Sequence, residues 1–212
     1  MGFAFTAFII SAGLWPQAMV TIYLCGVSVV IAMLIGVPLG ILAGQSEKAN
    51  TVMTVVIDTL QTLPTFVYLI PVVMLFKVGD FSAMIAVVMY AVVPAIRYAA
   101  VGIRGVDSQM VEAGIVSGCT PRQLVWKVKL PLAMPSILLG LNQTIMLALS
   151  MLVITALVGT RDLGQEVYIA LTKANAGKGV VAGLAVAFIA IMSDRVITAA
   201  VAKKSGMETP HV

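Results

Sequence analysis

The chain has 212 residues, of which 60% are apolar and only 10% are charged, and it carries a net charge of +4. A soluble domain averages about 45–50% apolar and about 25% charged residues, so the composition excludes an ordinary soluble enzyme and a disordered chain and indicates an integral membrane protein. His211 is the only histidine and no CxxC pair occurs, which argues against histidine catalysis and a metal site. No basic stripe interleaved with aromatic residues is present, which argues against nucleic-acid binding.

The first charged residue is Glu47. The 46 residues before it carry no charge. This uncharged run is too long for a single membrane crossing, because one crossing takes about 20 residues. We expect residues 1–18 to form a short or truncated first membrane segment that ends at Trp15-Pro16. A cleaved signal peptide is the alternative, although no basic residue precedes the apolar run.

Five full spans follow, separated by polar or turn-forming connections. Their expected ranges are 19–43, 51–76, 82–103, 136–158 and 179–202. The connections on the side of residues 104–135 carry the larger share of Lys and Arg, which places that loop in the cytoplasm. The chain is therefore expected to be an all-α, multi-pass membrane bundle, with a transmembrane domain over 19–204 and a tail over 205–212.

The loop over residues 104–135 shows signals for two short helices. Asp107 or Ser108 can cap the first helix, and Gly118 can end it because glycine tolerates a left-handed terminus. The second helix starts with a capping box and a proline in its first turn, and we expect it to end before Pro131; its starting residues are Thr120, Pro121 and Gln123. Such a hairpin is either an ordered protrusion that contacts another protein or a simple connection between spans.

This loop resembles the cytoplasmic loop of permease subunits of bacterial ATP-binding-cassette importers. That loop reads E-A-A, three residues, G, nine residues, I, one residue, L-P. The chain keeps the spacing with Glu112, Ala113, Gly114, Gly118, Val128, Leu130 and Pro131, and departs from the pattern only at Gly114 and Val128. The resemblance implies an ATPase-coupling loop that includes Thr120 and Pro121 and whose movement tilts the spans.

Longer stretches resemble permeases for glycine betaine and choline, which are quaternary ammonium osmoprotectants. The matching stretches are 36–41, 61–68, 132–136, 140–151 and 164–167, and the resemblance covers about residues 19–204. It implies a type I importer permease with a five-span core in the bacterial cytoplasmic (inner) membrane. A permease for another small solute, such as an amino acid, is the alternative, and a stand-alone secondary transporter is a weaker one.

The resemblance also implies a division of labour among several proteins. The chain lacks a GxxxxGK[ST] phosphate loop, so ATP and Mg²⁺ are used by a separate cytoplasmic ATPase dimer and the chain itself binds no cofactor. The other implied partners are a second permease subunit, either a copy or a paralogue, and an extracytoplasmic substrate-binding protein. The chain is thus a transport subunit and not an enzyme.

Polar groups inside membrane spans usually face a bundle interior or a cavity. On this basis the candidates for a translocation pathway are Asp58, Gln61, Thr62, Pro64, Tyr68, Asn142, Gln143 and Ser150. Asp58 has a structural alternative, an ion pair with Arg97 or Arg195 near the headgroups. Aromatic faces attract quaternary ammonium groups, but aromatic residues make up only 7% of the chain, so we expect the partner binding protein to supply most of the recognition.

Overall fold

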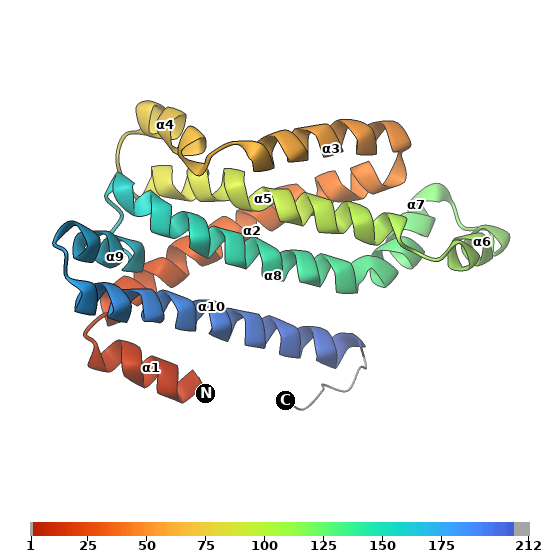
Figure 1. Cartoon of the computed structure of the whole chain (residues 1–212). Coiled ribbons are helices and arrows are strands. Elements are labelled where there is room, and N and C mark those ends of the chain that lie inside the picture. The colour runs from red at the N-terminus through yellow and green to blue at the C-terminus, as the bar shows by residue number, and fades with distance from the viewer. Residues whose placement is uncertain (1, 206–212) are drawn as a thin grey trace.

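The computed structural model describes residues 2–205, and these residues form helices and short connections without a strand (Figure 1). The expected all-α class is therefore confirmed. The helices are α1 (Gly2–Ser11), α2 (Trp15–Gln45), α3 (Glu47–Thr62), α4 (Thr65–Phe76), α5 (Asp80–Arg104), α6 (Ser108–Val116), α7 (Pro121–Gln123), α8 (Leu130–Thr155), α9 (Leu163–Thr172) and α10 (Ala176–Ser205). Except for Ser205, the expected tail over 205–212 lies outside the described residues, as does His211.

Four of the described helical segments are long and apolar enough to cross a membrane, and a bent helix pair makes a fifth possible span. The four are Trp15–Gln45, Asp80–Arg104, Pro121–Val158 and Ala176–Ala199, and the bent pair is α3 with α4. Five crossings thus agree with the five expected spans when the bent pair counts as one. Helix α1 has only 10 residues, about 15 Å of helix, which is half of a hydrocarbon core.

The break between α1 and α2 lies slightly before the expected place. The chain leaves α1 at Ser11 and passes through Gly13, whose φ of 70° is left-handed, before α2 begins at Trp15. Pro16 therefore lies in the first turn of α2, where the missing N–H group has no partner to lose. The proline starts the helix instead of ending the preceding segment.

The expected span over residues 51–76 is not one continuous helix, because α3 and α4 are bent by 89° relative to each other. Pro64 disfavours the helical conformation of the residue before it, and Leu63 is accordingly extended, with φ −68° and ψ 132°. The hydroxyl of Tyr68 donates a hydrogen bond back across the break to the carbonyl of Leu60. Figure 1 shows α4 turning away at the end of α3 that is remote from α6.

Helix α5 forms the centre of the bundle, between α2 and α8. The glycines of α2 that face it recur every four residues, at Gly36, Gly40 and Gly44. A Cβ atom on Gly40 would lie 2.5 Å from the Cβ atom of Ala99 and 2.5 Å from the carbonyl oxygen of Ile96. Small residues thus let the two backbones touch, which is how helices pack closely in a membrane.

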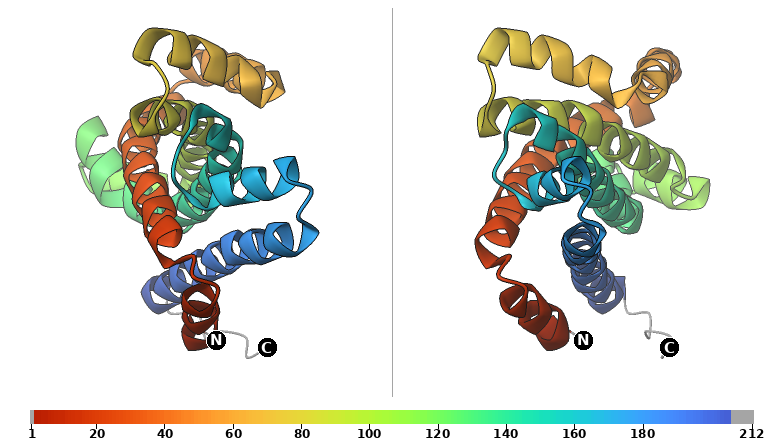
Figure 2. Two further views of the ribbon diagram at one scale, coloured as in Figure 1. Left: turned by 90° about the vertical axis from the view of Figure 1, so that its left-hand side faces the viewer. Right: turned by 60° about the vertical axis from the view of Figure 1, so that its left-hand side comes forward.

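The remaining helices lie on opposite sides of this three-helix centre. Figure 2 shows α3 and α4 on one side and α10 and α1 on the other. Helix α1 contacts α10 through stacked rings, since the centroids of Phe5 and Phe188 are 4.2 Å apart. The hairpin of α6 and α7 projects from one end of the bundle, and α4 and α9 lie at the other end (Figure 1).

Candidate functional site

The structure builds an ordered turn at the expected coupling loop. The side chain of Asp107 caps α6 by accepting a hydrogen bond from the backbone N–H of Gln109 at 2.9 Å. After α6 ends, Gly118 adopts a left-handed φ of 78°, and the N–H of Cys119 donates to the carbonyl of Gly114 at 3.1 Å. The reversal between the two helices therefore depends on a conformation that glycine adopts without a steric penalty.

The expected capping box is present at the start of the second helix. The N–H of Gln123 donates to the hydroxyl oxygen of Thr120 at 3.3 Å, and the N–H of Thr120 donates to the side-chain oxygen of Gln123 at 2.9 Å. Pro121 occupies the first turn. We call residues 107–129 the α6–α7 hairpin. A side-chain cap at the start of each of its two helices, Asp107 and Thr120, holds the backbone of the hairpin in place.

The second helix does not end before Pro131, contrary to the expectation from sequence. Residues Leu124–Lys129 form a π-helix that leads directly into α8, and the N–H of Leu130 donates to the carbonyl of Val125, five residues earlier. In a regular α-helix, Pro131 would lack an N–H group to donate and its ring would clash with the carbonyl four residues earlier. The wider π-helical turn before it relieves this conflict, and the helix continues past the proline. The second half of the hairpin is therefore the beginning of one helical segment of 38 residues, which runs from Pro121 to Val158.

One face of α6 packs inward and the other is open. Gly114 is buried, and a Cβ atom there would lie 2.7 Å from Cδ1 of Leu124. The open face exposes Glu112 together with apolar side chains, and Val116 is 88% exposed; the other large exposed apolar residues are Met110 and Ile115. An exposed apolar patch with an acidic neighbour is typical of a protein-docking surface.

We expect Gly114→Ala to be tolerated. The atom nearest to the new methyl group is Cδ1 of Leu124 at 2.7 Å, which ends a flexible side chain and can turn aside, and Cγ2 of Val128 follows at 3.3 Å. Alanine also favours a helix by about 1 kcal/mol over glycine. The purified variant is expected to melt at the wild-type temperature or slightly above it. Gly114→Leu serves as the contrast, because its bulk separates α6 from the π-helix; equal melting temperatures for the leucine variant and the wild type would contradict this packing.

The structure places Asp58 in an ion pair. A guanidinium nitrogen of Arg97 lies 2.6 Å from a carboxylate oxygen of Asp58, and Arg104 makes a similar 2.6 Å contact with Glu47. Both pairs join α3 to α5, and between them lies a pocket of about 380 Å³ that Asn50 and Thr54 also line. Arg97, and not Arg195, is thus the partner, and Asp58 both makes the structural pair and borders a polar pocket.

The other pathway candidates do not line that pocket. Gln61 and Thr62 are exposed on α3, Pro64 lies at the break, and Tyr68 is buried with its ring 6.0 Å from that of Tyr90. On α8, Gln143 and Ser150 are exposed. The eight expected residues are therefore spread over two sides of the bundle instead of forming one lined channel.

Asn142 leads to a residue that sequence reasoning missed. Its side-chain nitrogen donates to a carboxylate oxygen of Asp194 on α10 at 2.7 Å, while its own side-chain oxygen is buried without a hydrogen-bond partner among the described residues. An acid inside an apolar span is expensive and marks a site by default. That signal was available in the sequence, because Asp194 falls within the expected span over 179–202.

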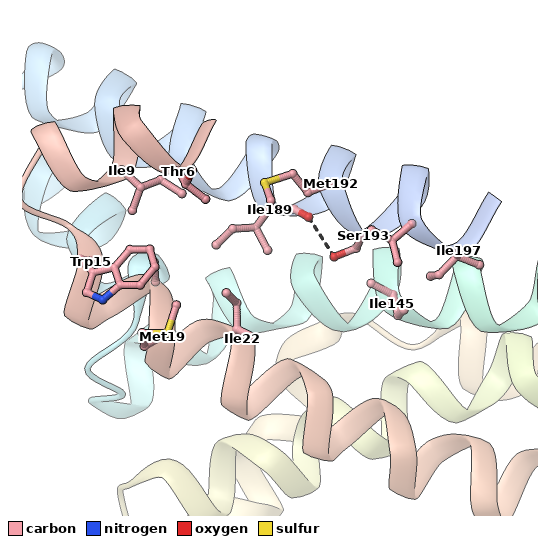
Figure 3. A pocket seen from close by; sticks show the side chains of 12 residues that line it. Thr6, Ile9, Trp15, Met19, Ile22, Ile145, Ile189, Met192, Ser193 and Ile197 are labelled. Atoms are coloured by element: carbon pink, nitrogen blue, oxygen red, sulfur yellow. Dashed lines mark hydrogen bonds between the residues drawn. The ribbon is translucent and has the colours of Figure 1, made fainter. Parts of the chain in front are cut away.

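A second pocket, of about 390 Å³, lies between α1, α2, α8 and α10 (Figure 3). Figure 3 shows Trp15 and Met19 at one end and Met192 and Ile197 along the other wall, with the hydroxyl of Ser193 directed to the carbonyl of Ile189 at 2.9 Å. Its lining is almost entirely apolar and includes no ionisable side chain. This pocket therefore does not suit a charged solute.

A buried polar cluster closes the end of the bundle opposite the hairpin. Asp162 is fully buried and caps α9 by accepting hydrogen bonds from the N–H of Gln165 at 3.0 Å and the hydroxyl of Thr160 at 3.1 Å. The N–H of Leu163 donates to the hydroxyl of Thr21 on α2 at 2.9 Å. Burial raises the pKa of the Asp162 carboxyl, and the two hydrogen bonds oppose that shift. The cluster fixes α9 against α2.

Comparison with known proteins places the chain in a family. A family model described as "Binding-protein-dependent transport system inner membrane component" matches residues 36–206. The glycine betaine transport system permease protein OpuAB of Bacillus subtilis is 44% identical over 184 residues, which are 87% of this chain and 65% of OpuAB. The trimethylamine N-oxide transport system permease protein TmoV of Pelagibacter ubique is 44% identical over 200 residues, 94% of this chain and 28% of TmoV.

A solved structure has the same fold. A chain of the MetNI methionine ABC transporter, in a crystal form with inward-facing conformations, superposes with a TM-score of 0.83 at 18% identity, covering 92% of this chain and 97% of that one. In length, the chain spans just under two thirds of OpuAB and less than a third of TmoV. The family match extends over the hairpin, the central helices and α10, and the chain is a member of the binding-protein-dependent transport system inner membrane component family.

Proposed function

We propose that the chain is the membrane-spanning permease subunit of an ATP-driven importer for glycine betaine and related quaternary ammonium solutes. The observation that carries the proposal is the α6–α7 hairpin, whose left-handed Gly118, capping box and exposed Glu112 occupy the spacing of the importer coupling loop. The 44% identity to OpuAB supports the substrate class. In this reading the hairpin faces the cytoplasm, and the membrane is the bacterial inner membrane.

The hairpin is proposed to dock on a separate ATPase dimer, which uses ATP and Mg²⁺. Its apolar residues Ile115 and Val116 are exposed, so they are available to a hydrophobic cleft. Glu112 makes no hydrogen bond or ion pair with another described residue, and it is therefore free to pair with a basic group of the partner. Docking and hydrolysis are then coupled to the spans through the uninterrupted helix that follows Pro121.

The translocation pathway is proposed to involve the side of the bundle that carries α3 and α4. Asp58 and Arg97 border a polar pocket there, and the break at Pro64 leaves backbone groups free of helical partners. Gln61, Thr62 and Tyr68 belong to the same side, whereas Asn142, Gln143 and Ser150 contribute from α8. A second permease subunit, either a copy or a paralogue, completes the pathway, and an extracytoplasmic binding protein delivers the solute to the end formed by α4 and α9.

A different solute is the main competing assignment. TmoV, which is named for trimethylamine N-oxide, is as similar in sequence as OpuAB. Trimethylamine N-oxide shares the methylated nitrogen of glycine betaine and lacks its carboxylate. The two assignments therefore differ in whether the assembled importer needs a cation to hold a carboxylate. Arg97 borders the pocket, but its guanidinium is already paired with Asp58, so it does not discriminate between the two solutes.

The proposal is tested with the chain reconstituted together with its ATPase and binding protein. We expect glycine betaine to stimulate ATP hydrolysis and uptake, and Glu112→Lys to reduce uptake by about tenfold, since reversing a charge at a docking surface costs on the order of 1–2 kcal/mol. Lys48→Glu, an exposed charge reversal outside the hairpin, is the matched control and should keep uptake near the wild-type rate. Stimulation by an amino acid and not by betaines would overturn the substrate assignment.

A further inference from the structure

A groove of about 470 Å³ lies between the end of α2 and the α6–α7 hairpin. One wall comes from α2, through Ile41, Leu42 and Gln45, and the other from the hairpin and the start of α8, through Arg122, Trp126 and Leu130. Trp126 is 66% exposed and Leu42 is 60% exposed. The groove is thus an open furrow along the outside of the bundle, separate from the polar pocket between α3 and α5.

The position of the groove along the bundle corresponds to the edge of the membrane. The uncharged run of α2 ends at Gln45, and the first charged residues of the chain, Glu47 and Lys48, follow immediately. Tryptophan is enriched at this level because its ring is apolar and its N–H prefers the polar headgroups. The groove therefore has an apolar half within the hydrocarbon region and a polar half among the headgroups.

The charge at the polar half is positive. Among the described residues, Arg122 is the one charged residue in the lining of the groove, and no acidic side chain contributes to that lining. Basic pockets between helices on the cytoplasmic side of a membrane bind anionic lipid headgroups, because the leaflet there is negatively charged. A groove lined mainly by apolar side chains together with one arginine suits a phospholipid, which has apolar acyl chains and an anionic headgroup.

We propose that this groove binds one anionic phospholipid of the leaflet that faces the hairpin. An acyl chain lies against Ile41, Leu42 and Leu130, and the phosphate contacts Arg122 beside the Trp126 ring. A lipid is favoured over a protein partner because the groove continues the exposed apolar surface of α2, where Leu34 is 70% exposed. The lipid connects the hairpin to α2, so it holds the hairpin at the membrane surface. The leaflet assignment rests on the orientation in the proposed function, but lipid binding does not require that transport occurs.

Native tryptophans supply the test, because Trp15 and Trp126 are the only two in the chain. The chain carrying Trp15→Phe is reconstituted into phosphatidylcholine vesicles with a small fraction of brominated phosphatidylglycerol or, separately, of brominated phosphatidylcholine. We expect the anionic quencher to reduce Trp126 fluorescence at least about twofold more than the neutral one at equal mole fraction. The experiment measures quenching and not transport. Its result therefore tests the lipid site alone, and it does not depend on whether the importer assignment is correct.

Two variants control the experiment. Adding Arg122→Gln to Trp15→Phe is expected to remove the preference for the anionic quencher. Adding Lys173→Gln is expected to preserve it, because Lys173 is an exposed residue directly after α9, which lies at the end of the bundle opposite the hairpin. The chain carrying Trp126→Phe reports from Trp15, whose pocket has no ionisable lining, and should show no preference. Equal quenching of Trp126 by both lipids means ordinary contact with bulk lipid, and no quenching by either means that protein fills the groove; each result overturns the proposal.

Discussion

Gly118→Val should lower solute uptake by the reconstituted importer by about tenfold or more while leaving the amount of folded permease unchanged. Gly118 has a φ of 78°, and no atom lies within 4 Å of the place where a Cβ would be. The substitution therefore meets no neighbour, and its whole effect comes from the backbone. A left-handed conformation costs an L-residue roughly 1–2 kcal/mol, more for a β-branched one, and 1.4 kcal/mol is a tenfold change in an equilibrium.

A graded series separates this conformational effect from simple bulk. Asparagine adopts the left-handed region most readily among the other residues, so Gly118→Asn should retain most of the uptake, Gly118→Ala should lose several-fold, and valine should lose most. Uptake and co-purification of the ATPase are measured in parallel for all three variants. If the losses follow side-chain size, with asparagine worse than alanine, the turn conformation is not what the ATPase requires.

Gly40→Ala should destabilise the bundle more than any other single-methyl addition in α2. The new Cβ atom would approach the carbonyl oxygen of Ile96 to 2.5 Å, and this backbone atom cannot rotate away as a side chain can. Overpacking of this kind typically costs about 1–3 kcal/mol, and the contact is central because it holds α2 against α5. Thermal unfolding of the purified chain in detergent should show a clear decrease in the midpoint temperature.

The same helix offers a matched control for that measurement. Gly26 also belongs to α2, but no atom lies within 4 Å of its would-be Cβ. Gly26→Ala should leave the midpoint temperature unchanged or raise it slightly, because alanine favours the helix. A similar decrease for both variants would show that the loss does not depend on the contact with Ile96, and the close approach of α2 to α5 would then not explain it.

Local chemistry explains what sequence reasoning predicted well. The capping box at Thr120 and Gln123 and the glycine turn at Gly118 depend only on residues within three or four positions of one another, and both are present in the structure. The spans depend on long apolar runs, and their number agrees when α3 and α4 count as one. The roles proposed for these residues in coupling are not decided by this geometry and stay predictions.

The failures occur where distant residues decide the outcome. Pro64 and Pro131 carry the same local signal, but the chain bends by 89° at the first and continues through a π-helix at the second. For Asp58 the sequence left two possible partners, and the packing of α3 on α5 selects Arg97 over Arg195. Likewise, Asp194 gains its meaning from Asn142, which lies 52 positions away in the chain.

The continuity of the helix from Pro121 to Val158 has a mechanical consequence. Its 38 residues make a rod of about 55 Å, nearly twice the thickness of a hydrocarbon core of about 30 Å. A rotation of about 10° at one end of such a rod displaces the other end by about 10 Å. In the proposed function, a small swing of the hairpin would therefore move the opposite end of this helix by a distance comparable to the width of a helix, with no hinge needed inside the membrane.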